Sequence, residues 1–252
     1  AVLDFKEPPK ISSYKETPKE AVPEQRTSTL TPSSIRFLQD SGALEYVNED
    51  RFRPYHHIKV WERQGRGFLS FEQTDNREMG RTIENNHLVA AIYEALKKKN
   101  NVEFIFGDDI SSLKPQDGHH RVLLKSGREL QYNLLVGSDG QKSKVKELKE
   151  ISSHGWSHNQ KAIVCTVETE YPTHGLWQRF IGDGPLALLS MWGNYVSVVW
   201  SLPNGKFDEV MELSDEAFLK KLNDTLSADP IQPLNVIQKY IQGGQRVEAP
   251  MV

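Results

Sequence analysis

A short run near the middle of the chain combines residue types that can bind an anion. Residues 134–136 are apolar and lead into Gly137, and Asp139 and Gly140 follow as a turn signal. A continuous apolar run of this kind is typical of a strand covered on both faces, and Ser143 can cap a helix that follows the turn. A strand that enters such a turn brings backbone N–H groups to one point, where an anion can sit. An ordinary joint between a strand and a helix has the same spacing.

Other residues that could do chemistry are better explained as ordinary structural residues. The pairs His56-His57 and His119-His120 fall in strand patterns, where adjacent side chains point to opposite faces and make a poor chelate. No third ligand lies at zinc spacing. The single cysteine, Cys165, lies in an apolar run and is predicted as a core residue. The sequence therefore predicts no metal site and no side-chain nucleophile.

Composition limits the classes to which the chain can belong. The chain has 252 residues, of which 37% are hydrophobic and 26% charged, a composition within the globular range. Its length allows one large domain or two smaller ones. The net charge of −3 at pH 7 argues against a nucleic-acid partner, because there is no basic excess to neutralise phosphates. No apolar run approaches the roughly 18 residues that span a bilayer.

The first half of the chain mixes strand and helix patterns. Residues 1–4 are predicted as the end of a strand that closes on Asp4. An acid at this place in a dinucleotide-binding unit bonds ribose hydroxyls, and its glycine fingerprint lies roughly 20 residues earlier, a stretch that this sequence does not contain. An exposed loop acid is the alternative interpretation. The elements expected next are a proline-rich loop at 5–23, a helix with its lead-in at 27–47, a hairpin at 57–71, a helix at 83–99, a strand at 102–106 and a hairpin around Ser126-Gly127.

The second half has the pattern of an antiparallel sheet. Four short strands are predicted in quick succession, at 161–168, 176–181, 185–191 and 195–202, and two helices are predicted at 213–226 and 230–241. Four tryptophans fall in this part of the chain: Trp156, Trp177, Trp192 and Trp200. We interpret them first as core residues, and second as walls of a pocket for an aromatic or isoprenoid ligand.

The glycine-rich turn also resembles a known motif. Residues 137–146 read Gly-Ser-Asp-Gly-Gln-Lys-Ser-Lys-Val-Lys and resemble the Asp-Gly motif of the flavin-dependent aromatic hydroxylases, which is written G-A-D-G-x-x-S-x-V-R. Ser138 stands in place of the alanine, and Lys146 stands in place of the arginine. The resemblance implies that Asp139 and Gly140 lie close to the pyrophosphate of FAD.

Three other positions match cofactor-contacting positions of the same family. Asp4 is the acid at a strand end, and Arg26 opens a run that resembles the family segment with a cofactor-contacting arginine. Asn85 precedes a helix at a position where many relatives have arginine or glutamine. The resemblance implies that Asp4, Arg26 and Asn85 also contact FAD. A solvated arginine at a loop end is the alternative for Arg26.

The second half narrows the resemblance. Residues 155–164, 177–180, 184–189 and 199–201 together resemble the UbiH family of ubiquinone-biosynthesis hydroxylases, and its mitochondrial branch in particular, although Ser190 departs from the usual proline. The implied fold class is α/β (α+β), with part of a Rossmann-like FAD-binding domain and an antiparallel-sheet substrate domain of the aromatic-hydroxylase type. The expected division is 1–48 for the FAD-binding domain, 49–82 for a hairpin insertion of the substrate domain, 83–150 for the continued FAD-binding domain with the Asp-Gly motif, and 151–252 for an incomplete substrate domain.

The resemblance implies an FAD-dependent monooxygenase that hydroxylates the aromatic ring of a polyprenylated ubiquinone precursor through a flavin hydroperoxide. The cofactor carries that chemistry while the protein positions the ring and excludes water, so no catalytic side chain is expected. The implied partners are a ferredoxin-type or NAD(P)H electron donor and the subunits of a ubiquinone-biosynthesis complex. The implied location is the matrix side of the mitochondrial inner membrane, with peripheral membrane association.

Two motifs of the family are absent from the sequence: the N-terminal glycine fingerprint and a later G-D-A-A-H segment near the flavin. We therefore expect the chain to be an internal fragment that is inactive alone and binds FAD poorly. Two alternatives stay open. One is a non-catalytic scaffold or interaction piece of the ubiquinone-biosynthesis complex, and the other is a related flavin enzyme with a soluble aromatic substrate.

Overall fold

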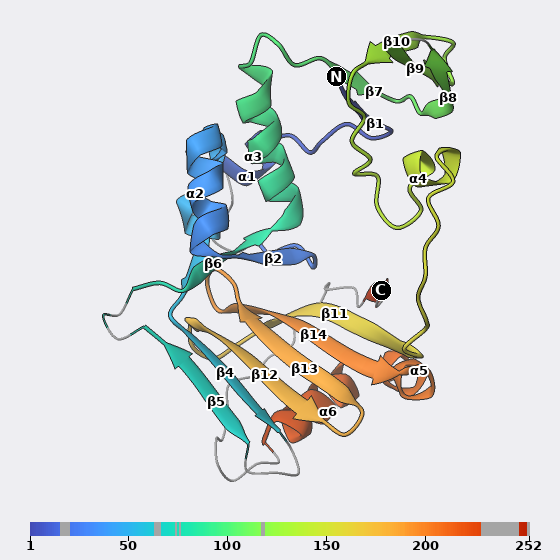
Figure 1. The fold of residues 1–252 in the computed structure, drawn as a ribbon. Coiled ribbons are helices and arrows are strands. Elements are labelled where there is room, and N and C mark those ends of the chain that lie inside the picture. Colours follow the sequence, from blue (N-terminus) through green and yellow to red (C-terminus); the bar gives the residue numbers. More distant parts are fainter. Residues whose placement is uncertain are drawn as a thin grey trace. The chain divides into compact units, whose positions relative to one another are not determined.

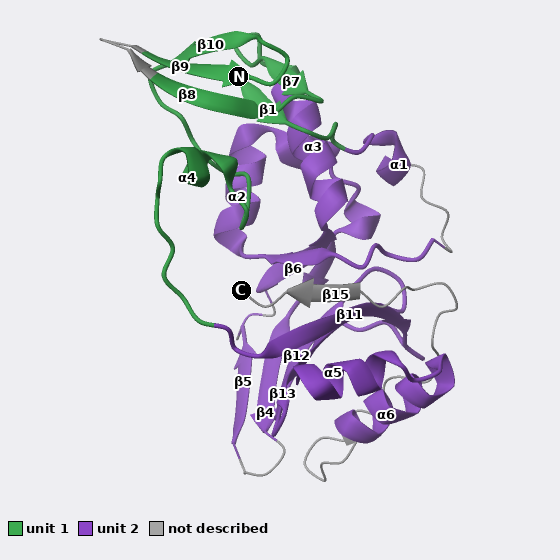
Figure 2. Ribbon diagram, turned by 90° about the vertical axis from the view of Figure 1, so that its right-hand side faces the viewer, with its two compact units in different colours: residues 1–8, 97–156 green, residues 9–96, 157–252 purple. Residues whose placement is uncertain are grey.

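The computed structural model describes residues 1–15, 21–62, 67–73, 75, 77–116, 119–227 and 247–250. The chain mixes helices and strands (Figure 1), which confirms the predicted α/β class. It divides into two compact units (Figure 2): unit 1 comprises residues 1–8 and 97–156, and unit 2 comprises residues 9–96 and 157–252. These units are compact in space and do not test the domain boundaries expected from the resemblance, which stay a prediction.

Unit 1 consists of two small sheets and a short helix. Its elements are β1 (Val2–Asp4), β7 (Phe104–Phe106), β8 (Ile110–Gln116), β9 (His119–Leu124), β10 (Glu129–Tyr132) and α4 (Lys144–Leu148). β1 and β7 pair in parallel, whereas β8, β9 and β10 form an antiparallel sheet. Gly127 turns the chain between β9 and β10 with a φ of +90°, which confirms the predicted hairpin. The buried core of unit 1 contains Ile105, Ile110, Val122 and Leu124.

The strand predicted at 134–136 is absent from this structure. Leu134 and Val136 are 80% and 71% exposed, and Leu135 between them packs against the core of unit 1. A strand needs a neighbour for its backbone N–H and C=O groups. Within the described residues no strand pairs with this segment. The prediction of a strand covered on both faces is therefore wrong here, because an apolar composition does not supply the partner strand.

A small three-stranded sheet with its helices forms one part of unit 2. Its elements are α1 (Ser12–Lys15), β2 (Thr27–Leu30), α2 (Pro32–Ser41), two 3₁₀ helices (Ala43–Tyr46 and Glu49–Arg51), β3 (Arg53–Tyr55), β6 (Gly80–Glu84) and α3 (Asn85–Lys97). β6 lies between β2 and β3 and is antiparallel to both. The side chain of Thr31 caps α2 by accepting a hydrogen bond from the Ser34 N–H at 3.4 Å, and Gly42 ends the helix with a φ of +80°.

Three predictions in this region need correction. The lead-in of the helix predicted at 27–47 is the strand β2, and the helix predicted at 83–99 begins only at Asn85, because residues 83–84 complete β6. The loop predicted at 5–23 contains the one-turn helix α1, whose Tyr14 is only 5% exposed. The predictions differ from the structure because contacts with distant parts of the chain decide the conformation of these segments, and local periodicity does not reveal such contacts.

The second part of unit 2 is a seven-stranded sheet in the order β15-β11-β14-β13-β12-β4-β5. Its elements are β4 (His57–Glu62), β5 (Phe68–Glu72), β11 (Gln160–Glu168), β12 (Gly175–Ile181), β13 (Gly184–Ser190), β14 (Tyr195–Pro203) and β15 (Val247–Pro250), with α5 (Asn204–Met211) and α6 (Asp215–Ser227). Every neighbouring pair is antiparallel except β4 and β12. Residues of α5 and α6 share one buried cluster with β11, β13 and β14, so the two helices cover one face of the sheet. The predicted antiparallel sheet is confirmed.

The tryptophans have different environments. Trp192 and Trp200 are 6% and 2% exposed and belong to the core, as expected, whereas Trp156 is 82% exposed. Cys165 is fully buried in the cluster beneath α5 and α6, which confirms its prediction as a core residue. The helix predicted at 230–241 lies outside the described residues. Among the helices in the described ranges, none has the length and apolar composition needed to cross a bilayer.

Gly80→Ala is expected to destabilise unit 2. A Cβ at this position would collide with the Leu30 carbonyl oxygen of β2 and with the Tyr55 ring of β3, and β6 is held between these two strands. We expect a loss of about 1–3 kcal/mol in the free energy of unfolding, measured by urea denaturation. Gly205→Ala in α5 is the control, because a Cβ there meets nothing within 4 Å. Equal stability of the two variants would contradict the collision.

Candidate functional site

Asp4 ends β1 with an exposed carboxylate. Its Oδ1 accepts a hydrogen bond from the Lys6 N–H at 2.9 Å, which closes a local turn, and its backbone carbonyl accepts one from the Gly107 N–H at 3.2 Å. The strand-end position predicted from sequence is therefore confirmed. Its proposed contact with a cofactor stays a prediction.

The Asp-Gly turn of unit 1 is organised by its own carboxylate. Asp139 accepts hydrogen bonds from the Ser143 hydroxyl and the Lys144 N–H, both at 2.5 Å, and from the Val145 N–H at 3.3 Å. The hydrogen bond from Ser143 holds the pKa of the Asp139 carboxyl below its ordinary value. Gly140 has a φ of +83°, which the turn requires. Asp139 itself therefore occupies the N–H groups at the start of α4 that the sequence suggested for an external anion.

A shallow pocket of about 460 Å³ opens beside this turn. Its walls are Gln141, Lys142, Ser143, Lys146, Glu147, Glu150, Ile151 and Ser152. Charged and polar side chains of both signs dominate this lining, which differs from the mostly apolar walls that enclose an aromatic ligand. The pocket therefore does not provide a site for an aromatic ring.

The structure brings two of the predicted cofactor residues together. Arg26 immediately precedes β2 and Asn85 immediately follows β6, and these strands pair so that Thr27 lies opposite Glu84. The Asn85 N–H donates to the Arg26 carbonyl at 3.0 Å, and the Ser28 hydroxyl donates to the Asn85 side-chain oxygen at 2.7 Å. Arg26 is exposed and Asn85 half-buried. Both lie in unit 2, whereas Asp4, Asp139 and Gly140 lie in unit 1.

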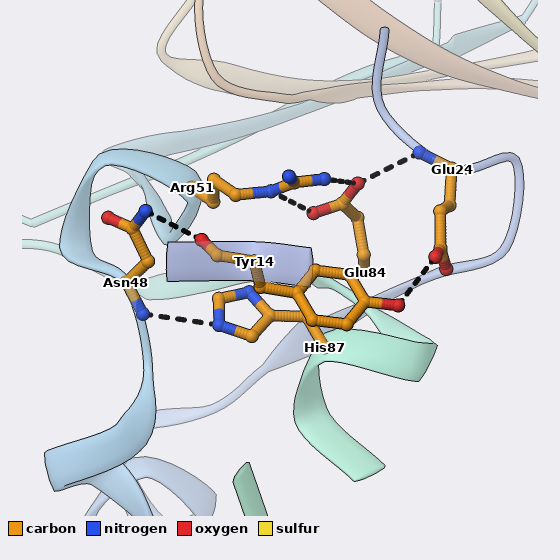
Figure 3. A network of polar contacts seen from close by, with 6 residues as sticks. All are labelled: Tyr14, Glu24, Asn48, Arg51, Glu84 and His87. Carbon is orange, nitrogen blue, oxygen red and sulfur yellow. Dashed lines mark hydrogen bonds and ion pairs between the residues drawn. The ribbon is translucent and has the colours of Figure 1, made fainter. Parts of the chain in front are cut away.

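A buried polar network includes Glu84, the residue that precedes Asn85 in the chain (Figure 3). Glu84 is fully buried, and its carboxylate accepts hydrogen bonds from Arg51 Nε at 2.7 Å, from Arg51 Nη2, and from the Glu24 N–H at 2.9 Å. The Arg51 guanidinium lies over two rings, those of Tyr14 and Trp192, at 5.1 and 5.2 Å from their centroids. This network was not predicted from the sequence. A charged residue at the end of the Thr82-Ile83-Glu84 strand was the available signal.

His87 belongs to the same network through its contacts with Tyr14 and Asn48 (Figure 3). The two rings stack with centroids 4.8 Å apart, and His87 Nε2 accepts a hydrogen bond from the Asn48 N–H at 3.1 Å. The Tyr14 hydroxyl donates to Glu24 at 2.7 Å, and burial raises the pKa of Tyr14. Since Nε2 is an acceptor, His87 is neutral and carries its proton on Nδ1. Within the described residues, no three His, Cys, Asp or Glu side chains come together as metal ligands.

The stability of unit 2 is expected to depend on pH through His87. Burial lowers the pKa of His87 to about 4 from its ordinary value of 6.5, so between these pH values the unfolded chain binds a proton that the folded chain excludes. Stability therefore falls as the pH drops from 6.5 towards 4, by on the order of 3 kcal/mol. Urea unfolding at pH 7, 5.5 and 4.5 measures this loss.

In this experiment His87→Gln should flatten the pH dependence, because glutamine keeps an acceptor for Asn48 but does not titrate. His154→Gln changes an exposed histidine and is the control. A His87→Gln variant with the same pH dependence as the unsubstituted protein would show that His87 does not cause it.

Comparison with known proteins identifies relatives of one kind. No family model matches the chain. The mitochondrial ubiquinone biosynthesis monooxygenase COQ6 of Danio rerio is 27% identical over 210 residues, which cover 79% of this chain and 43% of the relative. The 3-demethoxyubiquinol 3-hydroxylase of Escherichia coli is 28% identical over 181 residues, which cover 71% of this chain and 46% of the relative. The chain spans about half the length of the curated relatives that it matches.

Solved structures share the fold. PqsL of Pseudomonas aeruginosa, described as a probable FAD-dependent monooxygenase, aligns with a TM-score of 0.67 and 19% identity over 89% of this chain and 65% of its own. The p-nitrophenol 4-monooxygenase PnpA of Pseudomonas putida aligns with a TM-score of 0.60 and 16% identity over 98% of this chain and 61% of its own. The curated homologues of this chain are ubiquinone-biosynthesis hydroxylases, which are oxidoreductases of the monooxygenase class, as the sequence resemblance predicted.

Proposed function

We propose that this chain is part of an FAD-dependent monooxygenase that hydroxylates the aromatic ring of a polyprenylated ubiquinone precursor. The observation that carries the proposal is the similarity of about four-fifths of the chain to ubiquinone-biosynthesis monooxygenases. The fold shared with FAD-dependent monooxygenases supports it. Because the chain spans about half the length of these relatives, we assign the activity to the whole protein and not to this chain alone.

The residues assigned to FAD suit different parts of that molecule. The exposed carboxylate of Asp4 at the end of β1 is suited to accept hydrogen bonds from ribose hydroxyls. Arg26 offers an exposed cation, and Asn85 beside it offers an amide. Asp139 acts through shape, because its carboxylate is engaged in holding the turn and would repel a phosphate, and Gly140 lets the backbone approach closely. These assignments fit the chemistry of a dinucleotide.

FAD, when bound, supplies the redox chemistry that activates dioxygen for insertion into the ring. The protein is then required to bind the cofactor, orient the ring and exclude water, so we assign no side chain a catalytic role. The apolar polyprenyl tail favours a peripheral position at a membrane, and we place the protein on the matrix side of the mitochondrial inner membrane. A ferredoxin-type or NAD(P)H donor and the subunits of a ubiquinone-biosynthesis complex complete the proposed set of partners.

A non-catalytic role in the same complex is the second candidate. It is favoured by Asp139, whose carboxylate occupies the N–H groups at the start of α4 that the sequence suggested for an anion. The two candidates differ in cofactor content and turnover, so direct measurement of both separates them.

The purified 252-residue chain is expected to retain well under one FAD per molecule. It would be incubated with excess FAD and desalted, and its visible absorbance would be recorded. Low retention is expected because two stretches that contact FAD in the family are not in this sequence. A ratio near one would show that the residues present suffice for the cofactor, and the fragment expectation would fail.

Arg26→Ala in the full-length gene product is expected to weaken FAD binding by about tenfold to a hundredfold, because a charged hydrogen bond is worth roughly 1.5–3 kcal/mol. Flavin fluorescence titration measures this affinity. Arg36→Ala removes an exposed arginine from α2 and is the matched control.

The unsubstituted full-length protein is expected to hydroxylate a prenylated phenol in a turnover assay. Turnover of soluble phenols alone would contradict the proposed substrate.

A further inference from the structure

Two neighbouring residues at the junction of β6 and α3 hold the segment 24–28 at three points. The Glu84 carboxylate accepts a hydrogen bond from the Glu24 N–H at 2.9 Å. The Asn85 N–H donates to the Arg26 carbonyl at 3.0 Å, and the Ser28 hydroxyl donates to the Asn85 side chain at 2.7 Å. Arg26 lies at the centre of the held segment, with an attachment on each side of it. Its backbone position therefore depends on how firmly Glu84 and Asn85 are themselves fixed.

Glu84 is fixed by its burial and by Arg51. A fully buried carboxylate is strongly disfavoured unless a cation and hydrogen bonds compensate it, and Arg51 supplies both through two nitrogens. The guanidinium lies against the rings of Tyr14 and Trp192, and it is itself only 6% exposed. The fork of Arg51 and the carboxylate of Glu84 thus fit together in one orientation (Figure 3).

Tyr14 holds the same segment through the side chain of Glu24. Its hydroxyl donates to the Glu24 carboxylate at 2.7 Å, while its ring is stacked on His87 of α3. Glu24 is therefore held through its backbone by Glu84 and through its side chain by Tyr14. The backbone of the exposed Arg26, two residues later, is therefore restrained by the held Glu24.

We propose that Glu84 is a positioning residue that, through the Glu24 backbone, fixes the segment 24–28 and so sets Arg26 beside Asn85, where β2 begins and β6 ends. Glu84 does not touch the cofactor in this proposal. The inference rests on the proposed function in assigning Arg26 and Asn85 to FAD. The fixing of the segment itself is independent of any cofactor.

The first test needs no FAD. Amide hydrogen exchange of the full-length gene product would be compared for the unsubstituted protein, Glu84→Gln, and the apolar replacement Arg51→Met/Glu84→Leu. The double replacement removes both charges of the pair together, so it keeps the test valid where Glu84→Gln does not fold. We expect exchange in peptides covering 24–28 to rise by about tenfold or more, with the seven-stranded sheet unaffected.

The matched control is Glu49→Gln, which changes the exposed ion pair of Glu49 with Arg81 in the same unit. Its exchange at 24–28 should equal that of the unsubstituted protein. Unchanged exchange at 24–28 in a folded Glu84 variant would overturn the proposal, whatever FAD does.

The second test asks whether Glu84 acts through Arg26. FAD affinity would be measured for Glu84→Gln, Arg26→Ala and the double variant. If Glu84 works by placing Arg26, the double variant should bind FAD about as weakly as Arg26→Ala alone. Fully additive losses would overturn the positioning role. An unsubstituted protein that binds no FAD would instead refute the proposed function, while the exchange experiment would still decide the fixing of the segment.

Discussion

The buried pairing of Glu84 with Arg51 is the interaction on which the centre of unit 2 depends. Burying a carboxylate costs free energy unless a cation and hydrogen-bond donors surround it, and Arg51 and the Glu24 backbone provide them. Satisfying this one charge ties together segments that are distant in sequence. The 3₁₀ helix that carries Arg51, the loop before β2 and the end of β6 converge on it, and Trp192 adds the loop after β13.

Three acidic side chains near the residues assigned to FAD differ in how fully their carboxylates are already hydrogen-bonded within the protein. Asp139 is engaged with its own turn through three hydrogen bonds, so it shapes the backbone and does not attract a ligand. The Glu84 carboxylate is likewise engaged, with Arg51 and with the Glu24 N–H. Asp4 and Asp139 are both exposed, but the Asp139 carboxylate accepts three hydrogen bonds from its own turn, whereas the Asp4 carboxylate accepts one, from the Lys6 N–H. The chemistry available at the surface therefore comes from Asp4, Arg26 and Asn85.

The large sheet is completed by a hairpin from an earlier part of the chain. β4 and β5 precede β11 by about a hundred residues in sequence, yet β4 pairs in parallel with β12, where Lys59 lies opposite Trp177. This pairing joins the first half of the chain to the antiparallel strands of the second half. The helices α5 and α6 then cover one face of the combined sheet.

Elements with local signals could be predicted from the amino-acid sequence, whereas the other features depend on contacts between distant segments. The helix after Asn85, the hairpin at Gly127 and the four strands after residue 160 follow from apolar periodicity and turn residues. The residues of several motifs along the chain were also sufficient to predict the kind of relatives it has. The exposure of 134–136, the order imposed on Tyr14 and the Glu84–Arg51 pair depend instead on which segments meet. Local sequence does not predict these contacts, because the partners of strands and of buried charges come from distant parts of the chain.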